Sequence, residues 1–281
     1  MKWSVIGHEK QKVYFADILK TGRFAHAYLF TGPEMVGKRT FATELISAAH
    51  GGAVVGVSDP YAVRVGAPDR TTIEIEEDIR PLRSALHLRP PSGVRLFVIM
   101  DDADRMSRES ANALLKLLEE PPAYVTFMLI TARPAELPAT VRSRCHQVRF
   151  AAAADSAVAD DVGRKLPAKS RDALVALAGG RIGWVRRVLR DDAAEEIIAS
   201  GAELDQRLGQ GVAERLAWAK AVADRDDRRE LVGHWLAYSR PRLASEPGLS
   251  RRLHGLLELY DMLGQPQFNA RLAVEHFLLT A

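Results

Sequence analysis

A glycine-rich segment between an expected strand and an expected helix constrains this chain most. Residues 32–38 fit the pattern GxxxxGK, with an apolar run at 27–30 before them and a helical pattern at 41–49 after them. Gly32 and Gly37 let the backbone curl so that N–H groups point at phosphate oxygens, and the following helix adds a positive dipole. We expect Lys38 to lie against the outer phosphates of a nucleotide. A glycine-rich turn with a solvated lysine is the alternative, and the strand–helix context disfavours it.

The residue after the lysine departs from the usual pattern. A Ser or Thr hydroxyl normally holds Mg²⁺ at this position, but here the residue is Arg39 and Thr40 comes one residue late. On a helix, one step turns a side chain by about 100°. A cation at this point opposes metal binding. The loop is therefore compatible with ATP, whereas Mg²⁺ binding is left open and efficient hydrolysis is not expected.

A second apolar run, at residues 96–100, ends in Asp101 and Asp102. Asp101 is placed to assist Mg²⁺, and Asp102 stands where a glutamate normally activates water. The carboxylate of Asp102 is one methylene shorter than that of glutamate, so it falls short of the usual place for a base. A solvated acidic loop after a buried strand is an equally compatible interpretation. Together with Arg39, the shortened acid indicates an impaired catalytic site.

The order of elements predicts the fold class. Apolar runs at 125–130 and 147–150 and a helical pattern at 110–120 complete a strand–helix alternation, which is typical of an α/β fold with a parallel sheet covered on both faces. Alanine-rich, charged helical patterns follow. We predict an α/β domain over 1–152, a small helical domain over 153–192 and an all-α domain over 193–281. The Gly/Val-rich segment 50–68 is expected to be a connecting loop.

Composition excludes several classes of protein. The chain has 281 residues and one cysteine, which leaves no intramolecular disulfide and no cysteine-cluster zinc site and makes a reducing cytoplasm the default. We expect no signal peptide and no membrane span, because no apolar run is long enough. A net charge of +3 is too mild for a dedicated nucleic-acid binder. No helix-turn-helix pattern or basic stripe points to direct DNA specificity.

Several short segments are similar to those of a known family. They are residues 5–8, the run His-Ala-Tyr-Leu-Phe-Thr-Gly-Pro at 26–33, Leu-Leu-Lys-Leu-Leu-Glu-Glu-Pro-Pro at 114–122, and Thr-Val-Arg-Ser-Arg-Cys at 140–145. In this order the chain resembles bacterial DNA polymerase III clamp-loader subunits, which belong to the AAA+ family. The Gly-Lys-Arg-Thr end of the phosphate loop looks more like the delta-prime branch than the ATP-hydrolysing gamma/tau branch. The resemblance implies an AAA+ P-loop domain, a helical lid and an all-α collar for the three predicted domains.

The resemblance also implies roles for particular residues. Arg144 matches an arginine finger that acts in trans on the ATP of a neighbouring subunit, which can be worth about 10³–10⁵ in rate; a surface arginine in a basic loop is the alternative. Thr131 matches a position that senses the γ-phosphate, or is an ordinary hydroxyl at a strand end. Ile182 stands where active relatives carry an ATP-contacting arginine, a third departure from an active ATPase; Arg181 and Arg186 are nearby candidates for a substitute, and neither is assigned that role. Cys145 is expected to be a packed residue.

The expected function is that of a delta-prime-like clamp-loader subunit. It would supply a finger and a scaffold for ATP-dependent loading of the sliding clamp on primed DNA, as part of a DNA polymerase holoenzyme, with weak or absent ATPase activity of its own. The implied partners are gamma/tau and delta subunits, with the clamp and DNA reached through the complex. Many delta-prime-like relatives bind zinc through four cysteines, but residues 50–70 contain none, so we expect no zinc and assign no residues as metal ligands.

Two alternatives stay open at this point. The first is an ATP-hydrolysing AAA+ motor, such as a gamma-type subunit, a helicase loader or a branch-migration motor; Arg39, Asp102 and Ile182 argue against it. The second concerns the C-terminal helices. Apolar residues recur at helical spacing within 228–239 and 251–263, and we expect them to mediate oligomerisation. Packing inside a monomeric bundle would produce the same pattern.

Overall fold

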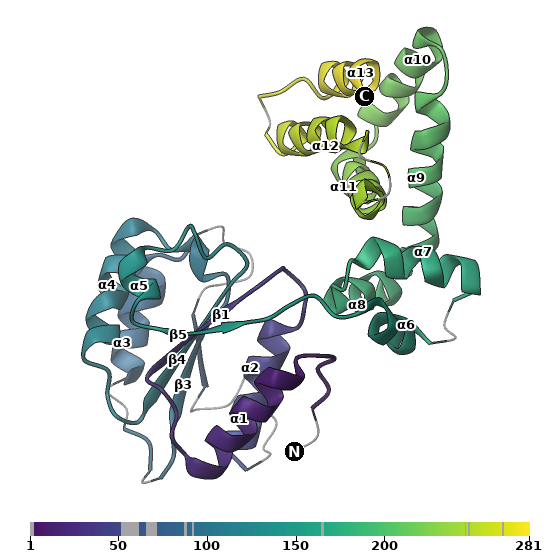
Figure 1. Cartoon of the computed structure of the whole chain (residues 1–281). Helices are drawn as coiled ribbons and strands as arrows, with labels where there is room; N and C mark the ends of the chain where they lie inside the picture. Colours follow the sequence, from purple (N-terminus) through teal and green to yellow (C-terminus); the bar gives the residue numbers. More distant parts are fainter. Residues whose placement is uncertain are drawn as a thin grey trace. The chain divides into compact units, whose positions relative to one another are not determined.

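The computed structural model describes residues 3–51, 62–65, 72–86, 89–91, 93–163, 166–244, 246, 248–265 and 267–281. The chain divides into two compact units, Met1–Ala153 and Ala154–Ala281 (Figure 1). The first unit is α/β and the second is helical throughout its described part. The further division of the second unit at residue 192 stays a prediction.

A five-stranded parallel sheet forms the centre of the first unit. The strands are β1 (Ala27–Thr31), β2 (Ala62–Val65), β3 (Leu96–Met100), β4 (Val125–Thr131) and β5 (His146–Arg149). They lie side by side in the order β2-β3-β4-β1-β5, and every pairing is parallel. All residues of β1, β3 and β4 are buried, which explains why they read as continuous apolar runs. The predicted α/β fold with a parallel sheet is confirmed.

Strand β2 corrects one expectation. It lies within the segment 50–68, for which the sequence predicted only a connecting loop. The strand is four residues long, includes an arginine, and pairs in register with β3 from Ala62 beside Phe97 to Val65 beside Met100. Its pairing with a buried neighbour, rather than its own composition, makes it a strand. Residues 52–61 and 66–68 of the same segment lie outside the described residues.

Helices cover both faces of the sheet. They are α1 (Glu9–Thr21), α2 (Lys38–Ala49), a π-helical turn η1 (Ile75–Ile79), α3 (Arg80–Leu86), a 3₁₀ turn η2 (Ala103–Arg105), α4 (Arg108–Glu119) and α5 (Ala139–Arg142). Phe15 of α1 and Phe41 of α2 pack in one core cluster, with alternate residues of the strands such as Tyr28. Leu82 of α3 and Leu114 of α4 pack in the other cluster, on the opposite face (Figure 1). Each central strand therefore contributes side chains to both cores.

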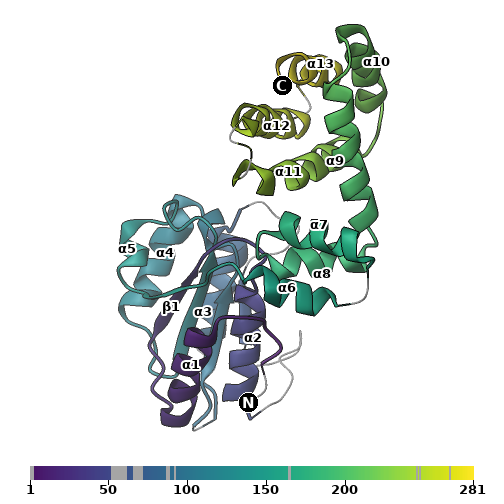
Figure 2. The same cartoon turned by 45° about the vertical axis from the view of Figure 1, so that its right-hand side comes forward.

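The second unit is built from short helices. They are α6 (Asp155–Val162), α7 (Ala168–Ala178), α8 (Ile182–Arg190), α9 (Ala194–Leu208), α10 (Val212–Ala223), α11 (Arg228–Ser239), the 3₁₀ turn η3 (Pro241–Ala244), α12 (Leu249–Leu263) and α13 (Ala270–Thr280). Figure 2 shows α9 to α13 gathered into a bundle. Its core contains Trp235 and Phe277, whose rings are stacked with centroids 6.4 Å apart.

Many of the apolar positions assigned to oligomerisation pack inside this bundle. Leu231, Trp235 and Leu256 are buried in its core, whereas Leu257 is 53% exposed. Intramolecular packing, the alternative interpretation, therefore accounts for most of the helical spacing. Ion pairs also link the elements of the bundle: Arg242 of η3 and Arg252 of α12 both bind Asp205 of α9. Burial opposes ionisation of Asp205, but the hydrogen bonds from the two arginines outweigh it and lower its pKa.

The close approach of the phosphate loop to the end of β5 gives a first prediction. Gly32 has φ 138°, and a Cβ atom there would lie 2.0 Å from the backbone oxygen of Phe150. We expect Gly32→Ala to destabilise the protein by about 2–4 kcal/mol, because backbone atoms must move. Gly22 is the matched control: its φ is 67° and the added methyl would meet nothing within 4 Å, so Gly22→Ala should cost only about 1 kcal/mol. Equal losses in denaturant unfolding followed by circular dichroism would contradict this account.

Candidate functional site

The carboxyl ends of β1, β3 and β4 bring the predicted site residues to one edge of the sheet. Thr31 at the end of β1 lies beside Thr131 at the end of β4, and Met100 at the end of β3 lies beside Leu129. The loops that follow these strands are therefore neighbours. This edge is where ligands bind in open parallel sheets. The structure thus gathers the glycine-rich loop, the acidic run and Thr131.

The loop backbone has the curled form that the sequence predicted. Gly32, Met35 and Gly37 have positive φ angles of 138°, 58° and 100°. A Cβ atom on Gly37 would lie 2.8 Å from Val5 Cγ2, so a side chain there would press on the amino-terminal segment. Helix α2 begins at Lys38 without a side-chain cap. The free N–H groups of its first turn, together with the loop, fit a phosphate group.

Lys38 is folded back over its own loop. Its side chain is buried, and Nζ donates hydrogen bonds to the backbone oxygens of Gly32 and Pro33, both at 2.6 Å. Burial lowers the pKa of Lys38, while the nearby carboxylates of Asp101 and Glu34 oppose this shift. The ammonium therefore satisfies loop carbonyls. A phosphate would have to replace these two acceptors to engage it.

Arg39 occupies the side of the site where a metal ion would be held. Its Nη1 lies 3.5 Å from Oδ2 of Asp101, and Thr40 is exposed. Burial and the neighbouring charge of Asp102 raise the pKa of Asp101, while Arg39 and Lys38 act in the opposite direction. The carboxylate suited to Mg²⁺ is thus paired with a guanidinium, and no hydroxyl follows the lysine. These residues do not fit a Mg²⁺ site, although the loop fits a phosphate.

The acidic run after β3 contains a residue that sequence analysis missed. Asp104 is nearly fully buried, with 3% of its side chain exposed, and pairs with Arg133 Nη2 at 2.7 Å. It also accepts a hydrogen bond from the hydroxyl of Thr131, which in turn accepts the backbone N–H of Arg133 at 2.9 Å. Asp102 is exposed and its Oδ2 lies 3.5 Å from Arg105. Spacing within the acidic run does not indicate this role, because the partners of Asp104 lie 27 and 29 residues later in the chain.

His8 supports the phosphate loop from the amino-terminal segment. Its Nε2 lies 2.8 Å from the backbone oxygen of Val36, and its ring meets the ring of Phe150 edge-on with centroids 4.8 Å apart. Burial lowers the pKa of His8, an effect that the bond to Val36 opposes. The sequence marked His8 only through family resemblance. The structure adds a physical role, because His8 links the loop to the end of the sheet.

Arg144 lies in the turn after α5 and is held by its own chain. Nη2 is 2.6 Å from Oε1 of Glu119 at the end of α4, and Nη1 donates to the backbone oxygen of Thr140 at 3.0 Å. Its side chain is 35% exposed. The next residue, Cys145, is buried in the core, and burial raises its pKa to about 12. Cys145 is therefore a packed residue, as predicted, while the guanidinium of Arg144 lies at the surface.

Arg181 and Arg186, the candidates for an ATP-contacting arginine, bind to neighbouring groups of the second unit. Ile182 is buried. Arg181 donates to the backbone oxygens of Ala178 and Leu177 at the end of α7. Arg186 makes two hydrogen bonds to the carboxylate of Asp161, at 3.0 and 2.9 Å. Both arginines thus have structural partners within the second unit.

No group of three or more His, Cys, Asp or Glu side chains within the described ranges lies close enough together to hold a metal ion. Among the helices that the structure describes, none is long and apolar enough to cross a bilayer.

The sequence of this chain is similar to that of DNA polymerase III subunits. Residues 56–154 match the family described as "DNA polymerase III, delta subunit". DNA polymerase III subunit tau/gamma of Haemophilus influenzae is 32% identical over 216 residues, which cover 70% of this chain and 31% of that protein. Subunit tau of Escherichia coli is 35% identical over 163 residues, 53% of this chain and 25% of the relative. Subunit delta' of Pseudomonas aeruginosa is 31% identical over 188 residues, 60% of this chain and 57% of the relative.

These matches support an AAA+ subunit of the clamp-loader kind. The chain spans less than a third of the tau/gamma relatives that it matches. A solved structure of a gamma-subunit-related protein of DNA polymerase III from Thermotoga maritima has a TM-score of 0.58 at 19% identity, covering 94% of this chain and 97% of that one. A RuvB structure from the same organism reaches 0.50 at 15% identity, with 66% and 61% covered. Both likenesses show that the chain shares the fold of these proteins, an α/β P-loop domain followed by a helical part.

The contact of His8 with the phosphate loop leads to a prediction of pH dependence. Its pKa is lowered in the folded protein, so below pH 6.5, the ordinary value for histidine, the unfolded chain binds more protons. The contribution of His8 to stability is therefore full above pH 6.5 and is lost as the pH falls through the folded-state pKa. As the pH falls from 7.5 to 5, His8→Gln should lose less thermal stability than the natural protein, because the natural protein alone carries this linked loss.

His254 is the matched control for this measurement. Its side chain is 77% exposed, and its Nε2 lies 3.2 Å from Oε1 of Glu258 one turn along α12. His254→Gln should follow the pH dependence of the natural protein. A melting profile of His8→Gln that coincides with both others would contradict the assigned role of His8.

Proposed function

We propose that this chain is a delta-prime-like subunit of the DNA polymerase III clamp loader. It supplies Arg144 in trans to the ATP of a neighbouring subunit and serves as a scaffold for loading the sliding clamp on primed DNA. The observation that carries the proposal is the ion pair between Arg39 and Asp101. An internal cation replaces the metal at this chain's own loop, while a surface arginine stays at the position of the finger.

The state of the loop supports a subunit that does not turn over ATP. Phosphoryl transfer requires Mg²⁺ bridging the phosphates and a lysine against them. Here the Lys38 ammonium bonds to loop carbonyls, and Arg39 neutralises Asp101. A nucleotide bound at this loop would gain phosphate contacts from backbone N–H groups. Without the metal, the site lacks the cation that bridges the β- and γ-oxygens and neutralises the charge that develops during transfer.

The surroundings of Arg144 support a role toward a partner. Its guanidinium contacts two acceptors, the Glu119 carboxylate and the Thr140 carbonyl. Glu119 is 49% exposed, and exposed pairs of this kind contribute only about 0–1 kcal/mol. Release from Glu119 therefore costs little. The planar fork can then span two oxygens of a γ-phosphate and stabilise its charge.

The second unit supports an assembly role. Most of the exposed large apolar side chains among the described residues belong to it: Val212, Leu243, Leu257, Phe268, Leu272 and Leu279. We propose that the helices of residues 193–281 join a collar shared with gamma/tau and delta subunits, with the clamp and DNA reached through the complex in the cytoplasm. The relatives named as DNA polymerase III subunits support such a partnership.

A gamma-type ATP-hydrolysing subunit is the second candidate. Tau/gamma proteins are among the relatives with high identity, and the cradle of the loop fits phosphate. The two candidates differ in one property, the turnover of ATP by the chain alone.

We expect the isolated chain to have negligible ATPase activity. The natural protein and Lys38→Ala should give the same background rate, because the site lacks a metal ligand. A Lys38-dependent turnover near 1 s⁻¹, on the order of slow working enzymes, would favour the gamma-type candidate. The double change Arg39→Ser with Asp102→Glu restores both missing groups and serves as the positive comparison. It should bind ATP more tightly with Mg²⁺ than with EDTA, whereas the natural chain should show no such difference.

We expect Arg144→Ala to lower the DNA- and clamp-stimulated ATPase of a reconstituted clamp loader without disturbing assembly. The fraction of the ATPase rate that is lost should equal the fraction of ATP sites that Arg144 completes. Arg144→Lys should not restore this rate, because an ammonium lacks the planar fork. Arg149→Ala, which removes an exposed arginine from β5, is the control and should leave turnover unchanged. Full turnover and clamp loading by the assembled Arg144→Ala complex would show that Arg144 is only a surface residue.

A further inference from the structure

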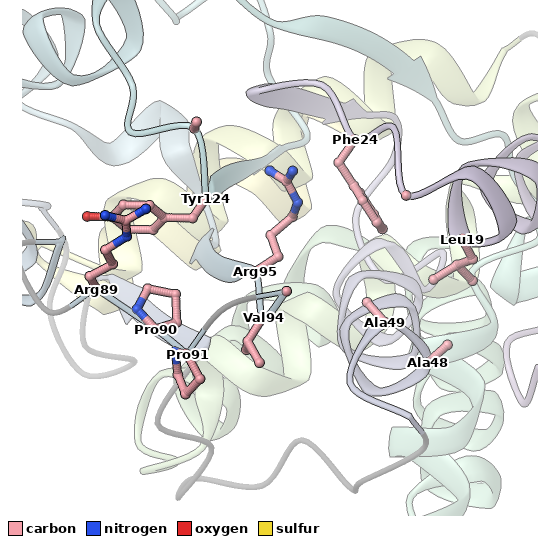
Figure 3. A pocket seen from close by; sticks show the side chains of 13 residues that line it. Leu19, Phe24, Ala48, Ala49, Arg89, Pro90, Pro91, Val94, Arg95 and Tyr124 are labelled. Atoms are coloured by element: carbon pink, nitrogen blue, oxygen red, sulfur yellow. The ribbon is translucent and has the colours of Figure 1, made fainter.

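A cavity of about 450 Å³ lies at the edge of the sheet opposite to the phosphate loop. Its lining residues include Leu19 near the end of α1, Ala49 at the end of α2, Phe24 before β1, and Tyr124 before β4. Because these residues precede the strands or end the helices, the cavity is at the amino edge. Figure 3 shows their side chains around the opening, with Arg89 and Arg95 among them. The volume suits a small ligand or a short peptide segment.

The charge of the cavity is unbalanced. Arg95 donates from Nη1 to the backbone oxygen of Val125 at 3.2 Å and to the hydroxyl of Thr126 at 3.1 Å, and its guanidinium lies 5.5 Å from the ring centre of Phe24. Burial lowers the pKa of Arg95. Arg89 is exposed. Among the described residues, none of those that line the cavity is a carboxylate, and no carboxylate pairs with either arginine.

The helix ends limit how much negative charge the cavity suits. Helices α1 and α2 reach it with their carboxyl ends, at Leu19 and Gly22 and at Ala48 and Ala49. Each such end carries about half a negative charge. The two positive guanidinium groups and the two negative helix ends together leave a net charge of about +1. This charge suits a ligand that carries one negative charge. A phosphate dianion fits this field less well than a single carboxylate, which an arginine fork can bind in bidentate form.

Apolar side chains line the cavity beside the two arginines. Leu19, Ala48 and Ala49 form one wall, Pro90 and Pro91 lie beside Arg89, and the Phe24 ring separates the apolar wall from Arg95 (Figure 3). An occupant should thus place an apolar group against the helix ends and its acid toward the arginines. Amphipathic recognition of this kind is typical of pockets with few polar groups at fixed positions.

We propose that this cavity is a binding site for a peptide segment that carries one carboxylate next to an apolar side chain. The acid is either the C-terminus of a protein chain or an Asp or Glu side chain. Arg89 and Arg95 bind the carboxylate, and the wall of α1 and α2 binds the apolar neighbour. The site is independent of the phosphate loop, so it lets a partner bind the first unit while the carboxyl edge of the sheet is engaged elsewhere.

The test uses the full-length chain labelled with ¹⁵N and four probes. Two peptides carry one acid each: acetyl-Ala-Ala-Leu with a free carboxylate, and acetyl-Ala-Asp-Leu-amide. The neutral acetyl-Ala-Ala-Leu-amide and inorganic phosphate are the comparisons. Titration should shift the backbone amide signals of Phe24, Ala49 and Tyr124 with at least one acidic peptide. The neutral peptide and phosphate should bind about tenfold more weakly, the loss expected for one charge-assisted contact. The acidic peptide that binds identifies the source of the acid.

Variants separate recognition from folding. Arg89→Glu should lower the affinity for the acidic peptide by at least about tenfold. It should not disturb folding, because Arg89 is exposed. Arg149→Glu makes the same change of charge at an exposed position on the edge strand β5. It should leave the affinity for the acidic peptide unchanged. Arg95→Gln tests the half-buried arginine, with the amide spectrum as a check on folding. Equal binding of acidic and neutral peptides, tighter binding of phosphate, unchanged affinity of Arg89→Glu, or no shifts with any probe would each overturn the proposal.

Discussion

Burial of β1, β3 and β4 on both faces decides where chemistry can lie in this protein. These strands present only apolar or hydrogen-bonded side chains to two cores, so charged groups are confined to the strand ends. At the carboxyl edge, the register of β1, β3 and β4 brings Lys38, Asp101 and Thr131 close together. At the amino edge, the same strands leave room for Arg95 beside Phe24. Two distinct polar regions follow from one packing constraint.

At the carboxyl edge, the fold of a nucleotide-binding site is kept while its chemistry is altered. Gly32 has the conformation and the close backbone approach that the phosphate loop requires. The groups that would act on a bound nucleotide are instead engaged with one another: Lys38 with loop carbonyls, and Arg39 with Asp101. Asp104 ties Thr131 to Arg133 in the same way. Such internal pairing stabilises the edge without a ligand, which suits a subunit whose task is to hold a shape.

Local patterns predicted the parts of the structure that depend on local sequence. The glycine-rich loop and the three buried strands follow from composition over a few residues, and the structure has them where expected. Strand β2 was missed because its pairing with β3 comes from distant residues. The role of Asp104 depends on Thr131, 27 residues later, and spacing within the acidic run alone does not indicate it. The cavity at the amino edge joins residues from four separate segments and has no motif.

The central claim is that the chain acts on a neighbour's ATP and not on its own. A high-resolution structure of the assembled clamp loader with a transition-state analogue of ATP tests it most directly. The account predicts that Arg144 leaves Glu119 and lies within hydrogen-bond distance of the γ-phosphate analogue of the adjacent subunit, while Arg39 still pairs with Asp101. The account is contradicted if the ATP analogue contacts Lys38 of this chain, with Mg²⁺ at Asp101, while Arg144 still pairs with Glu119.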